Sequence, residues 1–324
     1  MSKRCTLFFI IALFILMAIF AAGMVQAWTG DASPANPGGA DSAIPWWGWP
    51  LILLVVTFFM GILAVLGGVG GAVLYTPIIG GFFPFGMDFV RGAGLFVALA
   101  GSLAAGPGLL KKGLADLRLA MPVALIASTT AVMGAMVGLA LSDAIINTAM
   151  GIAILAIVVI MFLAKKSEYP EVGKADALSS ALRINGVYHE PSSGKDIDWK
   201  IHRTIHGLIL FVGIGFMAGM FGLGAGWANV PVLNLVMGAP LKVSVATSKF
   251  LLATTDTSAA WMYLNAGAVI PMIVVPSIIG IMMGSLVGVK ILAKSKPSAV
   301  RAVVLTMLVF AGVRALLKGT GIWK

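Results

Sequence analysis

The sequence predicts an all-α, polytopic helical membrane protein built from two inverted repeats, each with a broken, re-entrant helix. The chain of 324 residues is 60% hydrophobic and only 10% charged, which is typical of helical membrane proteins. Apolar runs such as 121–141 and 144–163 are continuous and long enough to cross a bilayer, whereas barrel strands alternate over about ten residues. A glycine cluster followed by a proline also occurs twice, 154 residues apart.

Residues 1–27 are predicted to form a signal peptide or an N-terminal transmembrane anchor. A basic start at 2–4 and small residues at 25–27 match a cleavable signal, but the apolar stretch between them is also long enough for an anchor. Residues 28–49 are rich in Pro, Gly, Ala and Ser and form a predicted external segment. Its last tryptophans suit either the interfacial aromatic belt or the core: Trp46, Trp47 and Trp49.

Two transmembrane repeats are predicted, over residues 50–164 and 204–317. A shift of 154 residues superimposes residues of the same type, most of them glycine or proline: Gly61 and Gly215, Gly68 and Gly222, Gly70 and Gly224, Pro77 and Pro231, Phe96 and Phe250, Gly113 and Gly267, Pro122 and Pro276, Gly134 and Gly288. Each repeat is expected to hold one broken segment and three spans: 51–79, 89–110, 119–141 and 144–163, then 205–237, 243–264, 269–292 and 299–317. Matching helix breaks in a duplicated chain are typical of secondary transporters.

The loop charges predict that the two repeats are inverted. If each broken segment crossed the membrane once, the basic residues of 111–118 and of the hydrophilic linker, 165–203, would lie outside, against the positive-inside rule. If each broken segment returns to the side from which it entered, both lie in the cytoplasm, and an odd number of crossings remains in each repeat. The C-terminal tail, 318–324, then lies outside. The expected location is the cell inner (cytoplasmic) membrane, with several passes.

Composition also excludes several functions. The net charge of +10 is interpreted as membrane topology, and no arginine-rich arm with interleaved aromatics indicates nucleic-acid binding. Cys5 is the single cysteine, so disulfide frameworks and cysteine-rich metal sites are excluded. The histidines lie in or beside the linker without the spacing of a metal site: His189, His202 and His206. No metal, cofactor or catalytic residue is predicted, and without an HExxH motif, paired intramembrane aspartates or a Ser/His constellation the protein is not expected to be an enzyme.

The linker, 165–203, is the most hydrophilic stretch of the chain. It holds seven basic and six acidic residues and is predicted to be a modest hydrophilic connection, not an independently folded domain. Within it, 183–199 contains short polar and β-prone pieces with a turn signal at Asn185-Gly186.

The glycine clusters have a structural and a functional interpretation. Small residues allow transmembrane helices to approach closely, but an unwound stretch also exposes backbone N–H groups and a helix N-terminus, which attract anions. Because the cluster is duplicated, a substrate-binding role is predicted for its residues and the prolines that follow: Gly68, Gly70, Gly71, Pro77, Gly222, Gly224, Gly226 and Pro231. A dinucleotide fingerprint is rejected, since Trp227 occupies its last glycine position.

Lys249 and Asp256 are ionisable residues inside the apolar span 243–264, where charge is costly and normally marks function. A spacing of seven residues places them on one helical face about 10 Å apart, too far for direct pairing. Lys249 is interpreted as neutralising an anionic substrate, the alternative being that it reaches the cytoplasmic surface. Asp256 is interpreted as carrying a coupling proton or holding a neighbouring lysine or hydroxyl.

Other polar residues add candidates in the second repeat. Asn229 and Asn234 border Pro231, and Ser248 precedes Lys249, so all three are candidate substrate ligands. The first repeat has different residues at the positions of Asn229, Lys249 and Asp256: Tyr75, Leu95 and Ser102. Two arginines lie near the ends of predicted spans. Arg91 could serve as an external gate charge or as an interfacial anchor, and Arg314 is expected to lie at the membrane interface.

Taken together, the two glycine-rich breaks with their prolines, the spacing of the spans that follow and the dividing linker resemble the TauE/SafE family of sulfite exporters and related anion permeases. The resemblance covers about 51–317. It implies an inner-membrane protein that moves small anions such as sulfite or sulfonates, and the predicted function is a secondary transporter, an exporter working by alternating access. Expected partners are the anionic substrate, the lipid bilayer, a coupling proton or cation and a second copy in a homodimer. A passive channel for small anions or neutral solutes is the alternative, ahead of an intramembrane enzyme or a scaffolding subunit.

Overall fold

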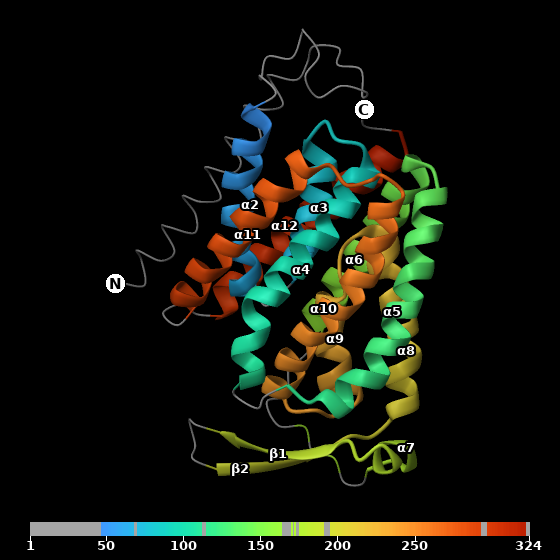
Figure 1. Ribbon diagram of the computed structural model, residues 1–324, viewed down its shortest axis with the longest axis vertical. Coiled ribbons are helices and arrows are strands. Elements are labelled where there is room, and N and C mark those ends of the chain that lie inside the picture. The colour runs from blue at the N-terminus through green and yellow to red at the C-terminus, as the bar shows by residue number, and fades with distance from the viewer. Residues whose placement is uncertain are drawn as a thin grey trace.

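The computed structural model describes residues 47–67, 70–111, 115–163, 170, 172, 175–190, 195–292 and 297–321. These residues form a bundle of long helices with a small β-hairpin at one end (Figure 1). The predicted signal peptide or anchor lies outside the described residues, as do Trp46, Gly68 and the C-terminal residues 322–324.

The second half of the bundle repeats the order of the first. The first half contains α2 (Gly48–Gly67), α3 (Gly71–Phe82), α4 (Met87–Lys111), α5 (Leu117–Ala140) and α6 (Asp143–Leu163). The second contains α8 (Thr204–Phe221), α9 (Gly226–Pro231) running into the π-helix η1 (Val232–Val236), α10 (Leu241–Asn265), α11 (Pro271–Leu292) and α12 (Pro297–Gly319). Both ends of α4 and α10 differ by 154 residues, so the shift found in the sequence also relates the helices.

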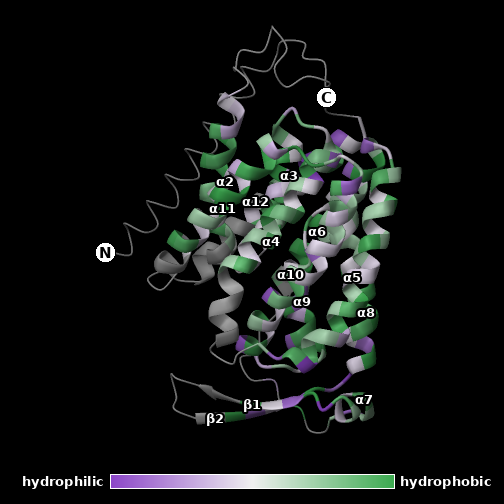
Figure 2. Ribbon diagram, in the orientation of Figure 1, coloured by the Kyte–Doolittle hydropathy of each residue, from purple (hydrophilic) through white to green (hydrophobic). Residues whose placement is uncertain are grey.

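Five helices of the described part of the chain are long and apolar enough to cross a membrane. The qualifying stretches are Met87–Ala104, Leu117–Ala140, Asp143–Ile160, Thr204–Phe221 and Pro271–Gly288. The predicted span on α10 is not among them, because this helix carries Lys249, Asp256 and a series of hydroxyl residues. Hydrophobic residues run along the helices and hydrophilic ones gather at the two ends of the bundle (Figure 2). The protein is therefore a polytopic helical membrane protein.

Each broken segment turns back to the end at which it begins. In the first half, the Trp49 ring near the start of α2 packs against Phe83 and Phe85 beyond α3, with centroids 6.2 and 5.6 Å apart. In the second half, the His202 amide before α8 donates to the Met237 carbonyl after η1 at 3.0 Å. The predicted return of the chain is thus seen in both halves. Trp49 packs in the core, which is one of the two interpretations of these tryptophans, whereas Trp47 is 56% exposed.

The two halves exchange helices. Helix α2 packs along α11, and its counterpart α8 packs along α5. A Cβ added at Gly61 would lie 2.6 Å from the Ile281 carbonyl oxygen, and one added at Gly215 would lie 2.3 Å from the Ala127 carbonyl oxygen. Ile281 and Ala127 are themselves 154 residues apart, so the same close contact is made twice with the halves exchanged. Glycine is required here because backbones touch.

Helices α4 and α10, which are counterparts, run in opposite directions (Figure 1). Gly92 near the start of α4 lies against Tyr263 near the end of α10. At the other end, the Asp116 amide beyond α4 donates to Thr247 Oγ1 near the start of α10 at 3.2 Å. Antiparallel counterparts are what the predicted inversion requires.

The linker has more structure than the sequence predicts. It contains α7 (Ala177–Ala181) and an antiparallel hairpin of β1 (Asn185–Glu190) and β2 (Lys195–Lys200), in which Asn185 pairs with Lys200 and Gly186 with Trp199. The prediction that Asn185-Gly186 forms the turn is wrong, since these residues begin β1. Gly186 is needed for packing instead, because an added Cβ would lie 3.1 Å from the Trp199 ring.

Asp176 joins the linker to the second broken segment. Its carboxylate accepts hydrogen bonds from the Ser179 amide at 2.8 Å and from the Thr204 amide and hydroxyl at 2.7 and 2.9 Å. Burial acts to raise the pKa of Asp176, but these hydrogen bonds outweigh it and hold the pKa at about 2. One side chain therefore caps both α7 and the start of α8.

Candidate functional site

The two glycine-rich breaks meet inside the bundle. Gly70 immediately precedes α3, and Gly226 begins α9. A Cβ added at Gly226 would lie 3.2 Å from Gly70 Cα and 3.3 Å from Gly70 N, so only backbone fits between the two breaks. The N-terminal ends of α3 and α9 therefore lie side by side.

Asp256 on α10 faces the second break. Its side chain is fully buried, and a Cβ added at Gly224 would lie 3.0 Å from Asp256 Oδ2. Gly224 has a φ of +66°, a left-handed conformation that favours glycine. The Ala225 amide interacts with the carboxylate, but neither oxygen has a hydrogen bond of normal geometry among the described residues. A buried carboxyl group in this state is costly and points to a functional role.

Further unpaired polar atoms lie on the same two elements, α9 and α10, which pack together. Asn229 is 1% exposed, and neither its amide oxygen nor its amide nitrogen has a partner in the part of the chain that the structure describes. The same holds for Trp227 Nε1 and Thr255 Oγ1. Because buried polar groups are nearly always hydrogen-bonded, these atoms make α9 and α10 the candidate substrate-binding elements.

Lys249 lies two helical turns before Asp256 on α10 and is partly buried. Its charge interacts with Asp256, but the two form no direct ion pair within the described residues. Ser248 is 2% exposed beside it. The predicted arrangement, a shared helix without direct pairing, is present.

Several glycines of the clusters serve close packing. A Cβ added at Gly222, which has a φ of +62°, would lie 2.4 Å from the Arg91 carbonyl oxygen. Gly71 packs against the side chains of Ile281 and Val97. At these positions the structural interpretation of the clusters applies, whereas Gly224 adjoins the Asp256 carboxylate and Gly226 contacts Gly70.

The prolines are not the helix breaks. Pro77 lies inside α3, and Pro231 lies at the end of α9, where the chain continues as the π-helix η1. A π-helical turn accommodates a residue without an N–H, so the helix persists beyond Pro231. In the second break, Gly222 and Gly224 supply the left-handed backbone between α8 and α9.

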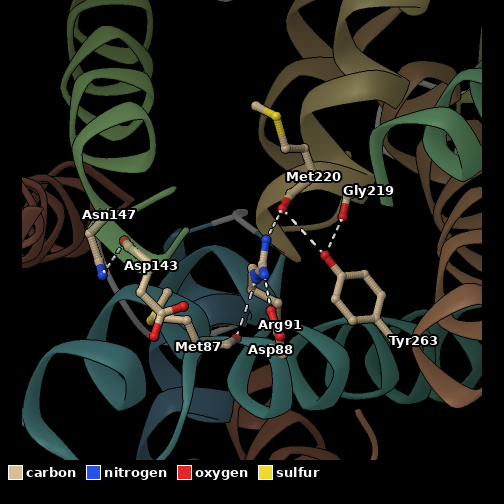
Figure 3. A network of polar contacts seen from close by, with 8 residues as sticks. All are labelled: Met87, Asp88, Arg91, Asp143, Asn147, Gly219, Met220 and Tyr263. Carbon is tan, nitrogen blue, oxygen red and sulfur yellow. Dashed lines mark hydrogen bonds and ion pairs between the residues drawn. The ribbon is translucent and has the colours of Figure 1, made fainter. Parts of the chain in front are cut away.

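A second polar cluster caps the interrupted end of α8 (Figure 3). Arg91 on α4 is fully buried, pairs with Asp88 and donates to the Met220 carbonyl oxygen at 3.0 Å. Its guanidinium also lies 5.6 Å from the centroid of the Tyr263 ring. The predictions of a gate charge or an interfacial anchor both missed this capping contact, because the partner carbonyl is 129 residues away in the chain.

Two further side chains complete this cap. The Tyr263 hydroxyl donates to the Gly219 carbonyl oxygen at 3.0 Å, and Thr76 Oγ1 donates to the Gly222 carbonyl oxygen at 2.7 Å. These carbonyls lose their helical partners when α8 ends. The sequence contains no local signal for either residue, since both contacts are long-range.

Other predicted residues stabilise element ends. Asn234 Nδ2 donates to the Ala239 carbonyl oxygen at 2.8 Å, which holds the turn after η1. Lys318 Nζ donates to the Gly80 carbonyl oxygen at 2.8 Å, and Arg314 stacks 3.7 Å above the Phe82 ring, both near the end of α3. Arg314 is therefore a packing residue and not simply interfacial.

A helical bundle with backbone breaks that meet beside unpaired polar groups defines a multi-pass membrane transporter. The chain belongs to the sulfite exporter TauE/SafE family, which matches residues 52–315. The family consists of transporters, and the protein is not an enzyme.

Two relatives carry transporter names. The chain is 25% identical over 281 residues to "Probable membrane transporter protein MJ0441" of Methanocaldococcus jannaschii, a match that covers 82% of this chain and 95% of that protein. It is 25% identical over 130 residues to "Probable membrane transporter protein YunE" of Bacillus subtilis, covering 40% of this chain and 47%, about half, of the Bacillus protein. No solved structure matches the chain significantly.

Proposed function

We propose that the protein is a secondary transporter that exports small anions, of the sulfite or organosulfonate type, across the cytoplasmic membrane by alternating access. The observation that carries the proposal is the meeting of the N-terminal ends of α3 and α9 at Gly70 and Gly226, beside buried polar groups without partners. Helix N-terminal ends favour negative charge.

The unpaired groups favour an oxyanion. The Trp227 indole nitrogen, Nε1, can only donate a hydrogen bond, so its partner must be an acceptor such as an oxyanion oxygen. Asn229 Nδ2 is a second buried donor on the same short helix. In the proposed complex, these donors and the backbone amides at the breaks bind the oxygens, while Lys249 compensates the charge.

Asp256 supplies the coupling step in this proposal. An ionised carboxylate beside the site repels an anion, whereas a protonated carboxyl group donates a hydrogen bond to it. Binding of the anion and of a proton at Asp256 therefore favour each other, which couples anion movement to proton movement.

The exchanged helices support the transport cycle. Antiparallel α4 and α10 and the exchanged pairs α2 with α11 and α8 with α5 fit two repeats inverted in the membrane. In the proposed orientation the linker is cytoplasmic, and the Arg91 cluster closes the opposite end of the site. Alternating access follows when one half moves against the other.

The test is flux of radiolabelled sulfite, sulfate, thiosulfate, sulfoacetate and an organic acid in proteoliposomes. The wild type is expected to move sulfite or a sulfonate in preference to sulfate, and Lys249→Ala to lose this flux while Lys249→Arg keeps it. Equal flux of wild type and Lys249→Ala at matched protein density contradicts the charge-compensation role. A voltage-driven current far faster than carrier turnover selects a passive channel instead.

A further inference from the structure

A cavity of about 670 Å³ lies at the linker end of the bundle, away from the site described above. Three elements enclose it: Arg118 belongs to the first turn of α5, Ser179 and Ser180 belong to α7, and Lys200 ends β2. Arg183, between α7 and β1, completes the basic lining.

Three cations converge on this cavity without a balancing acid. Arg118, Arg183 and Lys200 line it, and its described lining residues include neither Asp nor Glu. The neighbouring carboxylates cap helix ends, Asp116 accepting from the Leu119 amide at 2.7 Å and Asp176 from the Ser179 and Thr204 amides, and within the described residues neither forms an ion pair with the three cations. Three like charges from separate elements repel one another, so an anion between them is stabilising.

The backbone brings Arg183 into this group by an unusual conformation. Arg183 has a φ of 52°, in the left-handed region, where the chain turns after α7 through hydrogen bonds from its amide to Ser180 and from the Ile184 amide to Ser179. Glycine or asparagine is the ordinary residue at such a helix end. An arginine here carries a backbone cost and contributes a guanidinium to the cavity.

We propose that this cavity binds a phosphate-bearing anion, and that its occupant is the headgroup of an anionic phospholipid. Guanidinium groups bind phosphate oxygens in pairs, and the exposed Ser180 hydroxyl adds a neutral donor. Arg118 is the second residue of a helix of membrane-spanning length, so the cavity lies where lipid phosphates are found. A soluble phosphate ester shares the chemistry but lacks the acyl chains that α5 and its neighbours would contact.

The cavity is connected to the second broken segment. Ser179, one of its walls, donates from Oγ to the Ile201 carbonyl oxygen at 2.9 Å. Asp176, which accepts from the Ser179 amide, also caps Thr204, the first residue of α8. A headgroup that holds α7 against Arg118 therefore also fixes the start of α8.

The experiment uses the purified, delipidated full chain, with phosphatidylglycerol and phosphatidylcholine as probes and native mass spectrometry as the readout. Each charge near an anionic headgroup contributes about fivefold to affinity, so Arg118→Gln/Arg183→Gln is expected to weaken phosphatidylglycerol binding about 25-fold. Arg203→Gln is the matched control. Arg203 is exposed, has a similar left-handed φ of 54° and does not line the cavity, so it is expected to bind as the wild type does.

Each outcome decides the proposal. No preference of the wild type for phosphatidylglycerol, equal binding by the double variant, or an equal loss in Arg203→Gln overturns it. Thermal stabilisation of the wild type by soluble glycerol phosphate, lost in the double variant and without lipid retention, keeps the phosphate site and overturns the lipid occupant. If the double variant does not fold, Lys200→Gln provides the same test, since Lys200 is exposed at the end of a strand.

Discussion

The two glycine-rich breaks share a backbone plan but differ in how their polar groups are satisfied. In the first half, Tyr75 OH hydrogen-bonds Ser277 Oγ at 3.2 Å, and Ser102 donates to the Leu99 carbonyl oxygen at 2.8 Å. Their counterparts in the second half, Asn229 and Asp256, are equally buried but have no such partners within the described residues. The two halves therefore share a scaffold, and it is the second half that supplies the substrate-binding groups in our proposal.

The two halves also differ in the side chains that cap the end of α8. Arg91 and Thr76 reach from the first half to the carbonyls at the end of α8. The positions 154 residues later are apolar, Val245 and Val230. Valine side chains cannot donate hydrogen bonds, so these two positions of the second half provide no equivalent cap for the end of α2. The first half thus caps the break of the second half through these two side chains, but not the reverse.

Replacement of Asp256 tests the comparison most strongly. Asp256→Asn is expected to reduce pH-gradient-driven accumulation of the anion to that of empty liposomes, because the amide cannot carry the proton that binds together with the anion. Counterflow without a gradient is expected to persist. Ser102→Ala, the matched change in the first half, should leave both assays near wild type, and gradient-driven accumulation by Asp256→Asn would contradict the coupling role.

The next largest effect is expected at Asn229. Asn229→Ala removes a buried donor to a charged substrate and is expected to raise KM about tenfold or more. Tyr75→Phe is its control, since Ser277 retains a hydrogen bond to the Ile273 carbonyl oxygen at 2.6 Å when the phenol is lost. Initial-rate flux measurements compare the two variants, and equal KM values would remove the distinction between the breaks.

Where the halves are alike, matched substitutions should act alike. Gly61→Ala and Gly215→Ala each force a Cβ against a backbone carbonyl and are expected to destabilise the fold by about 1–3 kcal/mol. Gly213→Ala on α8 meets nothing within 4 Å and should leave Tm unchanged or slightly higher. Thermal unfolding of the purified variants measures this. A large difference between Gly61→Ala and Gly215→Ala would break the symmetry of the exchanged contacts.

Because the cap is present in one half, substitution at Arg91 should lower stability more than substitution at the matching position, Val245. Arg91→Met is expected to destabilise the fold by about 1–2 kcal/mol, since Met220 loses one donor while Tyr263 still donates to it at 3.3 Å. Val245→Met, at the matching position, is 38% exposed and should change stability by less than about 0.5 kcal/mol. Equal losses in Tm for the two variants would argue against the cap.

The smallest effect concerns the linker. The folded-state pKa of Asp176, about 2, lies below the usual unfolded value of about 3.9. Its contribution to stability is therefore complete above the unfolded pKa and is lost as the pH falls through about 2. The difference in Tm between wild type and Asp176→Asn should shrink as the pH is lowered over this interval. A difference that is independent of pH would exclude the carboxylate as its source.

Much of the fold could be predicted from residue type and spacing. The apolar runs and the 154-residue repeat predict the helices, because burial of the backbone in lipid leaves helices as the available structure. The partners of Arg91 could not be predicted, nor that Asn229 is buried without a partner among the described residues, since both depend on which helices of the two halves pack together. The turn assigned to Asn185-Gly186 failed for a similar reason: Gly186 is selected by the Trp199 ring across the hairpin.

The sequence by itself determined a duplicated helical membrane protein with glycine breaks and an ionisable pair on one helix, because composition and periodicity act locally along the chain. Only the tertiary structure decided that Gly70 meets Gly226, that Pro77 and Pro231 lie within helices, and that Asp256 and Asn229 lie near the second break without hydrogen-bond partners among the described residues. Whether a buried polar group is satisfied depends on atoms far away in the chain, and this is information that spacing alone does not contain.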